Sequence, residues 1–499
     1  MSASSDRIAY GRIGRDTATY TAGILINRAA SFFMLPIYSR YLSPQDYGVI
    51  QLVEMTLDFA AILAGARLVV GLFRYYHSAT TEDERRAVTS TSFLLICCAY
   101  MSVSLVVTTL AVPLSRLVFH GTGQVALIRI AAAALAAQSL SIVPLAYARA
   151  RGRSDLFVLA NAIQLGLQIS LNLFFLVYLR LGPKGAFLSN LTSSLVVGLV
   201  LAGTLIRSTG LRFSSAATRR LTRYGLPLVA TQIATFFATF GDRYFLNNSA
   251  DMTTVGLYAL AYQFGFMLQM VGSMPVELVW EPIRFSLAER PDHDRVLSRA
   301  FVYLNVLLIS AALGITLFVG DVLRVMTIPA FYPAARLVPV ILVAYVFQSW
   351  TGMQDVGIHL RERTEYITAA NWVAGLVAMA GYFLLIPSLL GLGAAIATVL
   401  AFAVRFFMVQ YISRRLLPVR YQWTPVLRLI GLAAVAAAIS FAVPSAGILG
   451  SLALRGMLFL GYVFAAWNAG VLTGDERAFA RRIVSTRLRR GRAEIATAP

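Results

Sequence analysis

Long apolar runs separated by short polar connections fill nearly the whole chain. A transmembrane helix needs about 20 consecutive apolar residues to cross the hydrocarbon core of a bilayer. Fourteen runs meet this requirement, at residues 17–39, 47–72, 90–114, 125–148, 156–179, 185–206, 225–247, 255–280, 300–320, 335–358, 366–387, 391–412, 425–443 and 449–471. Most connections are short, and none is long enough for a soluble domain. The pattern predicts an all-α polytopic membrane protein with about 14 transmembrane helices.

Basic residues gather in every second connection, which fixes the expected orientation. The N-terminal segment carries Arg7, Arg12 and Arg15, and further arginines cluster in alternate loops and in the tail after residue 472. Because Lys and Arg are retained on the cytoplasmic side of a membrane, this alternation predicts that both termini lie in the cytoplasm.

The composition supports a membrane protein and excludes several other classes. The chain of 499 residues is 58% hydrophobic and 13% charged, with a formal net charge of +20. On a soluble protein such a charge would suggest nucleic-acid binding, but here the arginines lie between apolar runs. Cys97 and Cys98 are adjacent within an apolar run, so we expect neither a disulfide framework nor a metal site. No phosphate-binding loop is present, and we expect no cofactor.

The two halves of the chain resemble each other. SFFMLPIYSRYL (31–42) is similar to TFFATFGDRYFL (235–246), and each is followed by a polar turn and a glycine, Gly48 or Gly256, that opens the next run. Each copy holds six runs, so both have the same orientation, and the repeat is a parallel pseudo-twofold one. We therefore expect an N-terminal lobe at 1–210, a C-terminal lobe at 211–415, two extra helices at 416–472 and a basic cytoplasmic tail at 473–499.

Three segments carry a family resemblance. LINRAASFFMLPIYSRYLSPQDYGVIQLVEM (25–55), GDRYFLNNSADMTTVGLYALAYQ (241–263) and FYPAARLVPVIL (331–342) resemble bacterial Wzx-type polysaccharide-lipid flippases. These belong to the multidrug/oligosaccharidyl-lipid/polysaccharide (MOP) exporter superfamily. The resemblance implies two six-helix lobes around a central cavity, two extra C-terminal helices, and export of a lipid-linked glycan across the bacterial inner membrane. The long charged and aromatic signatures expected of a peptidoglycan-precursor flippase are not evident.

Charged residues inside the first two runs are the first site candidates, because a charge at the bilayer centre is costly and normally faces a partner or water. Arg28 lies deep in the first run, where it either binds an anion in a cavity or pairs with Glu54 or Asp58. Those two carboxylates are four residues apart and share one helix face. They are expected to hold Arg28 in position or to take up a coupling proton.

Four more charged residues complete the candidate site. Arg67 and Arg405 lie in the cytoplasmic halves of their runs, where they line the cavity, contact another helix or reach toward the surface. Asp242 and Arg243 lie at the outer end of the seventh run, where they form a gate pair or a helix cap. We expect Arg28, Arg67 and Arg405 to bind the substrate.

The expected function is to flip a polyprenyl diphosphate-linked oligosaccharide from the cytoplasmic to the outer leaflet by alternating access, for surface polysaccharide synthesis. The expected partners are this lipid-linked glycan, anionic lipid headgroups at the basic tail, and glycan-assembly proteins. The alternatives are a small-molecule exporter of the same superfamily, a peptidoglycan-precursor flippase, or a membrane glycan polymerase. A polymerase would need a sizeable outer loop, and no outer connection exceeds about a dozen residues.

Overall fold

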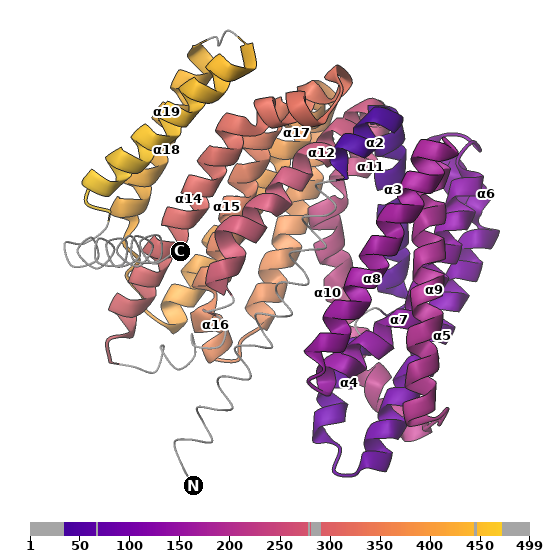
Figure 1. Ribbon diagram of the computed structural model, residues 1–499. Coiled ribbons are helices and arrows are strands. Elements are labelled where there is room, and N and C mark those ends of the chain that lie inside the picture. Colours follow the sequence, from indigo (N-terminus) through magenta and orange to yellow (C-terminus); the bar gives the residue numbers. More distant parts are fainter. Residues whose placement is uncertain (1–33, 66–67, 278–279, 281–290, 444–446, 472–499) are drawn as a thin grey trace, which may run out of the picture. The chain divides into compact units, whose positions relative to one another are not determined.

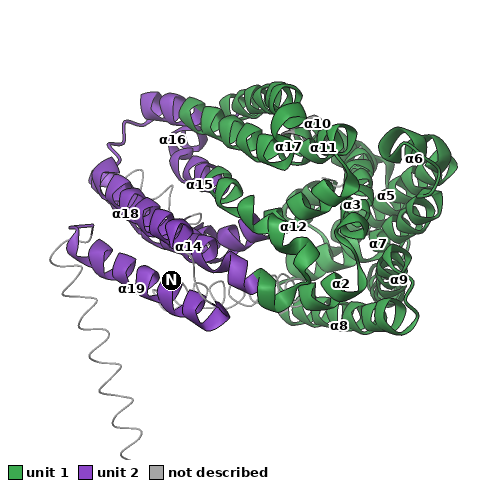
Figure 2. Ribbon diagram, turned by 90° about the horizontal axis from the view of Figure 1, so that it is seen from above, with its two compact units in different colours: residues 1–263, 323–344, 365–408 green, residues 264–322, 345–364, 409–499 purple. Residues whose placement is uncertain are grey.

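The computed structural model describes residues 34–65, 68–277, 280, 291–443 and 447–471. Throughout these residues the secondary structure is helical, without a strand. The chain divides into two compact units (Figure 2). Unit 1 comprises the described residues of 1–263 together with 323–344 and 365–408, and unit 2 comprises those of 264–322, 345–364 and 409–499. Each unit therefore draws on segments far apart in the sequence.

The helices follow one another along the chain as labelled in Figure 1. The first group comprises α2 (Leu35–Tyr41), α3 (Pro44–Leu63), α4 (Leu68–Ser78), α5 (Glu82–Thr109), α6 (Ala111–Phe119), α7 (Val125–Ala150), α8 (Ser154–Asn172), the π-helix η1 (Leu173–Tyr178), α9 (Pro183–Thr209), α10 (Ser215–Phe240) and α11 (Asp242–Ser249). The second group comprises α12 (Met252–Leu268), the π-helix η2 (Gln269–Ser273), α14 (His293–Met326), the 3₁₀-helix η3 (Pro329–Arg336), α15 (Val338–Gln354), α16 (Val356–Leu360), α17 (Glu365–Leu416), α18 (Trp423–Ala442) and α19 (Gly447–Asn468).

Helix α3 begins where its sequence predicts a helix start. The Ser43 hydroxyl accepts a hydrogen bond from the Asp46 backbone N–H at 3.1 Å, and the Asp46 carboxylate accepts one from the Ser43 backbone N–H at 3.0 Å. This reciprocal capping box satisfies two backbone donors. Pro44 occupies the first turn, where its missing N–H costs nothing. The polar turn that the sequence placed before Gly48 is thus a helix cap.

Helix α17 is a hairpin rather than a straight rod. Leu390 has φ 49° and ψ −126°, far from helical values. A Cβ added at Gly381 would lie 2.7 Å from the Ala397 Cβ. In a straight helix these residues would be about 24 Å apart, so the two arms fold back against each other. The predicted runs 366–387 and 391–412 are these two arms.

The described residues contain nine helices long and apolar enough to cross a membrane, or eleven when two broken pairs each count as one span. The protein is a multi-pass, all-α membrane protein, and the predicted fold class is confirmed. The number of 14 spans and the division into lobes remain predictions. Residues 1–33, which include most of the first run, and the basic tail after 471 lie outside the described residues.

The core of unit 1 is built on α7, which packs against α5 and runs beside α9 (Figure 1). Small side chains of α7 are fully buried there, including Ala131, Ala132 and Ser139. Across the contact, a Cβ added at Gly198 of α9 would lie 2.9 Å from the Leu140 Cβ. Small residues let membrane helices approach closely, because lipid offers no hydrophobic driving force between them. Close packing of small residues therefore holds this bundle together.

Unit 2 is held by polar contacts between its helices. Asp321 of α14 is 2% exposed and accepts hydrogen bonds from the Ser451 hydroxyl of α19 at 2.8 Å and from the Arg455 guanidinium at 2.5 Å. The Trp350 indole N–H donates to the Asn305 side-chain oxygen at 2.7 Å, which ties α15 to α14. Buried polar groups in a bilayer need such partners. The ion pair therefore fixes the last described helix, α19, to α14.

Candidate functional site

The two carboxylates of α3 lie in an accessible position within an apolar helix. Glu54 and Asp58 are exposed, whereas Leu52, Val53 and Met55 between and beside them are buried. The Gln51 side-chain amide donates to the Glu54 carboxylate at 2.9 Å. In the described part of the chain, neither carboxylate has an ion-pair partner. A charged side chain that is accessible within a span faces water or a ligand, because hydrocarbon would not solvate it.

Helices α10 and α11 pack against α3 within unit 1. The Thr56 and Tyr244 hydroxyl oxygens lie 3.1 Å apart and share a hydrogen bond. One turn further along α3, the Phe59 ring packs on those of Phe236 and Phe237, at centroid distances of 5.3 and 5.5 Å. Polar and aromatic contacts thus fix α3 on the side that does not carry its carboxylates. The carboxylates themselves are left accessible on a rigidly held helix.

Asp242 and Arg243 form a second, deeply buried charged site at the start of α11. Their side chains are 0% and 1% exposed, and the guanidinium donates to the Asp242 carboxylate at 2.7 Å. The Tyr258 hydroxyl also donates to this carboxylate, at 2.6 Å, and the Tyr262 hydroxyl does so at 3.3 Å. The guanidinium carbon lies 3.9 Å from the centroid of the Tyr262 ring, in a cation–π contact. Both charges are therefore neutralised within the protein.

The sequence left two roles open for this pair. Helix α11 begins without a side-chain capping hydrogen bond. The Asp242 carboxylate accepts its hydrogen bonds from Arg243 and the two tyrosines. The Arg243 guanidinium donates to the Thr239 carbonyl at 3.0 Å, back in the last turn of α10. The pair therefore joins α10, α11 and α12. A gating role stays a prediction.

Helices α3 and α12 cross at two glycines that the repeat places in equivalent positions. A Cβ added at Gly48 would overlap the Met252 carbonyl and lie 3.0 Å from the Gly256 nitrogen. A Cβ added at Gly256 would overlap the Pro44 carbonyl and lie 2.9 Å from the Gly48 nitrogen. The contact is reciprocal, as expected where a residue meets its own counterpart on a twofold axis. Sequence reasoning aligned these glycines but did not predict that they meet.

Of the three arginines predicted to bind the substrate, the structure describes only Arg405. Arg28 and Arg67 lie outside the described residues, so their predicted anion-binding role and their pairing with the α3 carboxylates stay predictions. Arg405 is half-buried on the second arm of α17, in unit 1. Among the described residues, no three His, Cys, Asp or Glu side chains gather in a way that could hold a metal ion.

One protein family matches the sequence. The family described as "Polysaccharide biosynthesis protein" matches residues 13–287, which is more than half of the chain. The chain belongs to this family. Among curated proteins, no sequence matches it significantly. The match includes the whole of α3, α11 and α12, and therefore both charged sites and the glycine crossing.

Solved structures similar to this polysaccharide biosynthesis family member share its fold. One is "Lipid II flippase MurJ, inward closed conformation", with TM-score 0.75 and 10% identity over 91% of this chain and 99% of that one. Another is an inward-facing multidrug-resistance MATE transporter of the MOP superfamily, with TM-score 0.64 and 18% identity over 78% and 94%. A third, from Pyrococcus furiosus, is described as a MOP superfamily transporter with a binding pocket of reversed polarity, with TM-score 0.53 and 19% identity over 81% of this chain and 96% of that one.

These likenesses are all below 25% identity, so they establish the fold. Together with the family match they confirm the predicted resemblance to the polysaccharide branch of the MOP superfamily. The chains they match are described as a flippase and as transporters. The substrate of this chain has to be argued from its own residues.

Proposed function

We propose that this protein flips a polyprenyl diphosphate-linked oligosaccharide from the cytoplasmic to the outer leaflet of the bacterial inner membrane by alternating access. The observation that carries the proposal is the accessible pair Glu54 and Asp58 within an apolar span of a polysaccharide biosynthesis family member. Accessible charges in a span require water or a polar ligand beside them. A hydrated route along α3 would accommodate a sugar, which hydrocarbon cannot solvate.

The substrate's diphosphate needs positive charge, and three arginines are proposed to supply it. Arg28, Arg67 and Arg405 lie in predicted spans, and guanidinium groups bind phosphate through paired hydrogen bonds. The lipid tail would stay in the bilayer while the headgroup crosses. With both termini in the cytoplasm, as the arginine distribution predicts, outward movement of each negative charge gains about 2.3 kcal/mol per 100 mV of inside-negative potential.

Glu54 and Asp58 have two proposed roles on this route. They hold Arg28 in position, or one of them takes up a proton that is coupled to transport. Two carboxylates one turn apart repel each other when both are ionised, which favours uptake of a proton by one of them. Neutralising both residues would abolish transport under either role.

The glycine crossing is proposed to close one end of the route. Gly48 and Gly256 lie at the starts of α3 and α12, on the side that the arginine distribution predicts to be outer. Their backbones touch, and this contact would close the proposed route between the two helices. Alternating access would require this contact to open, and the buried pair Asp242–Arg243 would hold α11 and α12 together as it does so.

The proposal is tested by reconstituting the purified protein into phospholipid vesicles with a polyprenyl diphosphate trisaccharide labelled in its sugar. A membrane-impermeant glycosidase then reports how fast the sugar changes leaflets. We expect the double variant Glu54→Gln/Asp58→Asn to flip at least 10-fold more slowly. Asp155→Asn, at an exposed carboxylate in the first turn of α8, is the matched control and keeps the normal rate. Equal rates for the wild type and protein-free vesicles would refute the proposal.

A second candidate is export of a small organic cation. The observation that favours it is that the accessible charges described on α3 are both acidic. The same vesicles decide between the two functions when they are loaded with a fluorescent cation or with lipid II in place of the trisaccharide lipid. Cation efflux lost in the double variant, without sugar-lipid flipping in the wild type, would establish the exporter instead. Faster flipping of lipid II than of the trisaccharide lipid would assign a cell-wall precursor.

A further inference from the structure

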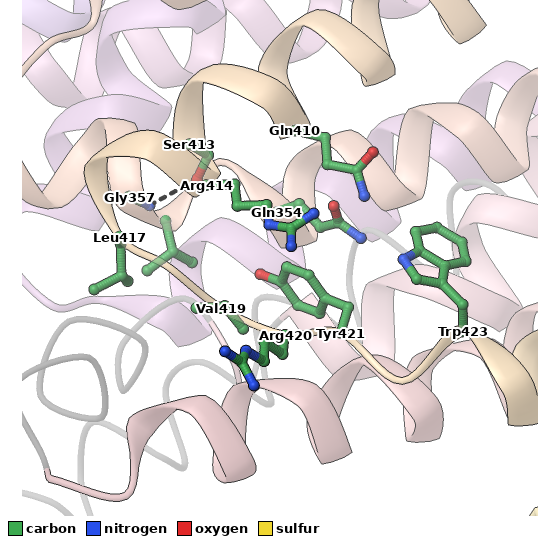
Figure 3. Close-up of a pocket in the computed structure, with 11 residues that line it drawn as sticks. Gln354, Gly357, Gln410, Ser413, Arg414, Leu417, Val419, Arg420, Tyr421 and Trp423 are labelled. Atoms are coloured by element: carbon green, nitrogen blue, oxygen red, sulfur yellow. Dashed lines mark hydrogen bonds between the residues drawn. The ribbon is translucent and has the colours of Figure 1, made fainter.

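A pocket with several polar side chains in its lining lies in unit 2. Its volume is about 320 Å³, and it is bounded by α16, the last turns of α17, the linker to α18 and the first residue of α18 (Figure 3). Ligand sites in proteins usually span about 300–1,000 Å³. The pocket therefore has room for one small polar group. By the arginine distribution, the α17–α18 linker is predicted to face the cytoplasm.

The strongest sign of a ligand is the side chain of Gln354, which lines the pocket. It is 1% exposed, and among the described residues neither its amide nitrogen nor its amide oxygen has a hydrogen-bond partner. A buried amide without partners is costly, and it is retained where something outside the chain satisfies it. Figure 3 shows Gln354, Gln410 and Arg414 gathered around the same space, with the ring of Tyr421 beside them.

The charge of the pocket lining is positive. Arg414 and Arg420 both line it, both are exposed, and within the described residues neither guanidinium has an ion-pair partner. The lining contains no carboxylate. Asp294 and Asp355 lie near Tyr421 but outside the lining, and the Asp294 carboxylate accepts a hydrogen bond from the Arg420 backbone N–H. Two unpaired guanidinium groups beside neutral donors favour an anion.

The walls of the pocket are rigid. A Cβ added at Gly357 would lie 2.6 Å from the Ser413 carbonyl oxygen, so α16 and α17 touch backbone to backbone. The Gly357 N–H donates to the Ser413 hydroxyl oxygen at 3.1 Å, which leaves the hydroxyl hydrogen free to bind a ligand (Figure 3). This contact sets the position of one neutral donor of the pocket.

Aromatic packing fixes the opposite wall. The Tyr421 and Trp423 rings pack on Phe301 at centroid distances of 5.1 and 5.2 Å, and Trp423 also packs on Trp350 at 5.3 Å. Burial raises the pKa of the Tyr421 hydroxyl, and the negative charges of Asp355 and Asp294 raise it further. The hydroxyl therefore stays protonated at neutral pH and remains able to donate.

We propose that this pocket binds a phosphate group through Arg414, Arg420 and the amide of Gln354. A phosphate offers several acceptor oxygens to guanidinium, amide and hydroxyl donors. Two sources share this chemistry: the headgroup of an anionic phospholipid and a soluble phosphate ester. A bound phosphate would bridge α15, α17 and the linker, and so brace the corner from which α18 departs. This inference does not depend on the substrate of the flippase.

Binding is measured on the full-length protein, purified in neutral detergent and stripped of lipid. Three probes are titrated separately: short-chain phosphatidylglycerol, short-chain phosphatidylcholine as a lipid without net charge, and glycerol 1-phosphate. We expect Arg414→Gln/Arg420→Gln to weaken binding of the anionic probe roughly 10-fold, equal to about 1.4 kcal/mol. The matched control is Arg415→Gln, because that exposed guanidinium packs 4.4 Å from the Tyr411 ring and does not line the pocket. It should change binding less than 2-fold.

Gln354→Leu gives an independent readout. Removing a buried amide that has no partner should raise the melting temperature of the ligand-free protein, while the stabilisation caused by the anionic probe is lost. Binding of phosphatidylglycerol alone assigns a lipid headgroup, and binding of glycerol 1-phosphate assigns a soluble ester. If no anionic probe binds the wild type, or if Arg415→Gln weakens binding as much as the double variant does, the pocket is not a phosphate site.

Discussion

The two charged sites of unit 1 differ in how their charges are stabilised: one is a buried ion pair, and the other is a pair of accessible carboxylates. Asp242 and Arg243 are buried and neutralise each other, with two tyrosine hydroxyls completing the shell. Glu54 and Asp58 are accessible, and among the described residues they have no ion-pair partner. A buried pair of this kind holds helices together, and its burial keeps it from contacting a substrate. Accessible carboxylates contribute little to stability, and they are free to take part in transport.

Breaking the buried pair should have the largest effect. Asp242→Asn leaves the Arg243 guanidinium buried without its counter-charge, which costs about 3–5 kcal/mol. We expect a large loss of folded protein, measured by size-exclusion chromatography after a heating series in detergent. The double variant Asp242→Asn/Arg243→Met removes both charges and should recover most of the loss. A single variant as stable as the wild type would show that the pair does not hold these helices.

Breaking the Asp321–Arg455 ion pair of unit 2 should destabilise the protein less than breaking the Asp242–Arg243 pair. Arg455 is 18% exposed at its side chain, so water can partly solvate it when its partner is lost. We expect Asp321→Asn to cost about 2 kcal/mol, close to the value of a hydrogen bond to a charged group. The same heating series measures it. A loss as large as that of Asp242→Asn would contradict the role of burial in the comparison.

Removing the carboxylate of Asp251, which caps the start of α12, should lower the stability of the protein slightly and by an amount that depends on pH. Asp251 accepts hydrogen bonds from the Thr254 backbone N–H at 2.8 Å and from the Thr254 hydroxyl at 2.6 Å, which lower the pKa of this carboxyl. Replacing a helix-capping carboxylate by alanine costs about 1 kcal/mol. Because the folded pKa is the lower one, this stability is present above the unfolded value near 4 and is lost as the pH falls through the folded value.

The Asp251 prediction is checked by comparing melting temperatures of the wild type and Asp251→Ala. The difference should be full at pH 6 and shrink toward pH 3. The exposed Asp155→Asn variant, examined at the same pH values, corrects for the general effect of acid. A difference that does not change with pH would mean that the charge of Asp251 plays no part in the cap.

Removing the accessible carboxylates should change stability least. Since Glu54 and Asp58 have no ion-pair partner among the described residues, Glu54→Gln/Asp58→Asn should shift the free energy of unfolding by less than about 1 kcal/mol. The heating series measures this shift on the same preparation that is used for the flipping assay. A loss of folded protein equal to that of Asp242→Asn would make these carboxylates structural, and would remove the contrast between the two sites.

Hydrophobic patterning predicted most of the fold because long apolar runs have few alternatives in a membrane. The runs 125–148 and 449–471 correspond to α7 (Val125–Ala150) and α19 (Gly447–Asn468) within a few residues. The break between α3 and α4 was not predicted, although Gly65 and Arg67 interrupt the apolar run between these helices. The break between α5 and α6 was not predicted either, because the chain stays apolar across it. The π-helices η1 and η2 were missed for the same reason.

The candidate site was only partly predictable from the sequence. The spacing of Glu54 and Asp58 placed them on one helix face, since helical periodicity is local. The enclosure of Asp242 by Tyr258 and Tyr262 depends on how α11 and α12 pack, which no local pattern encodes. The pair of Asp321 and Arg455 joins residues more than 100 positions apart, and the neutral Gln354 gave no signal at all.

The glycine crossing has a mechanical consequence. At Gly48 and Gly256 two helices meet through their main chains, with no layer of side chains between them that could compress or rotate. Main-chain atoms have fixed positions within a helix, and closely packed protein gives way very little. Such a contact would be stiff while the helices touch and would be lost once they part. Helices that meet this way would separate in a single step and would not bend apart gradually.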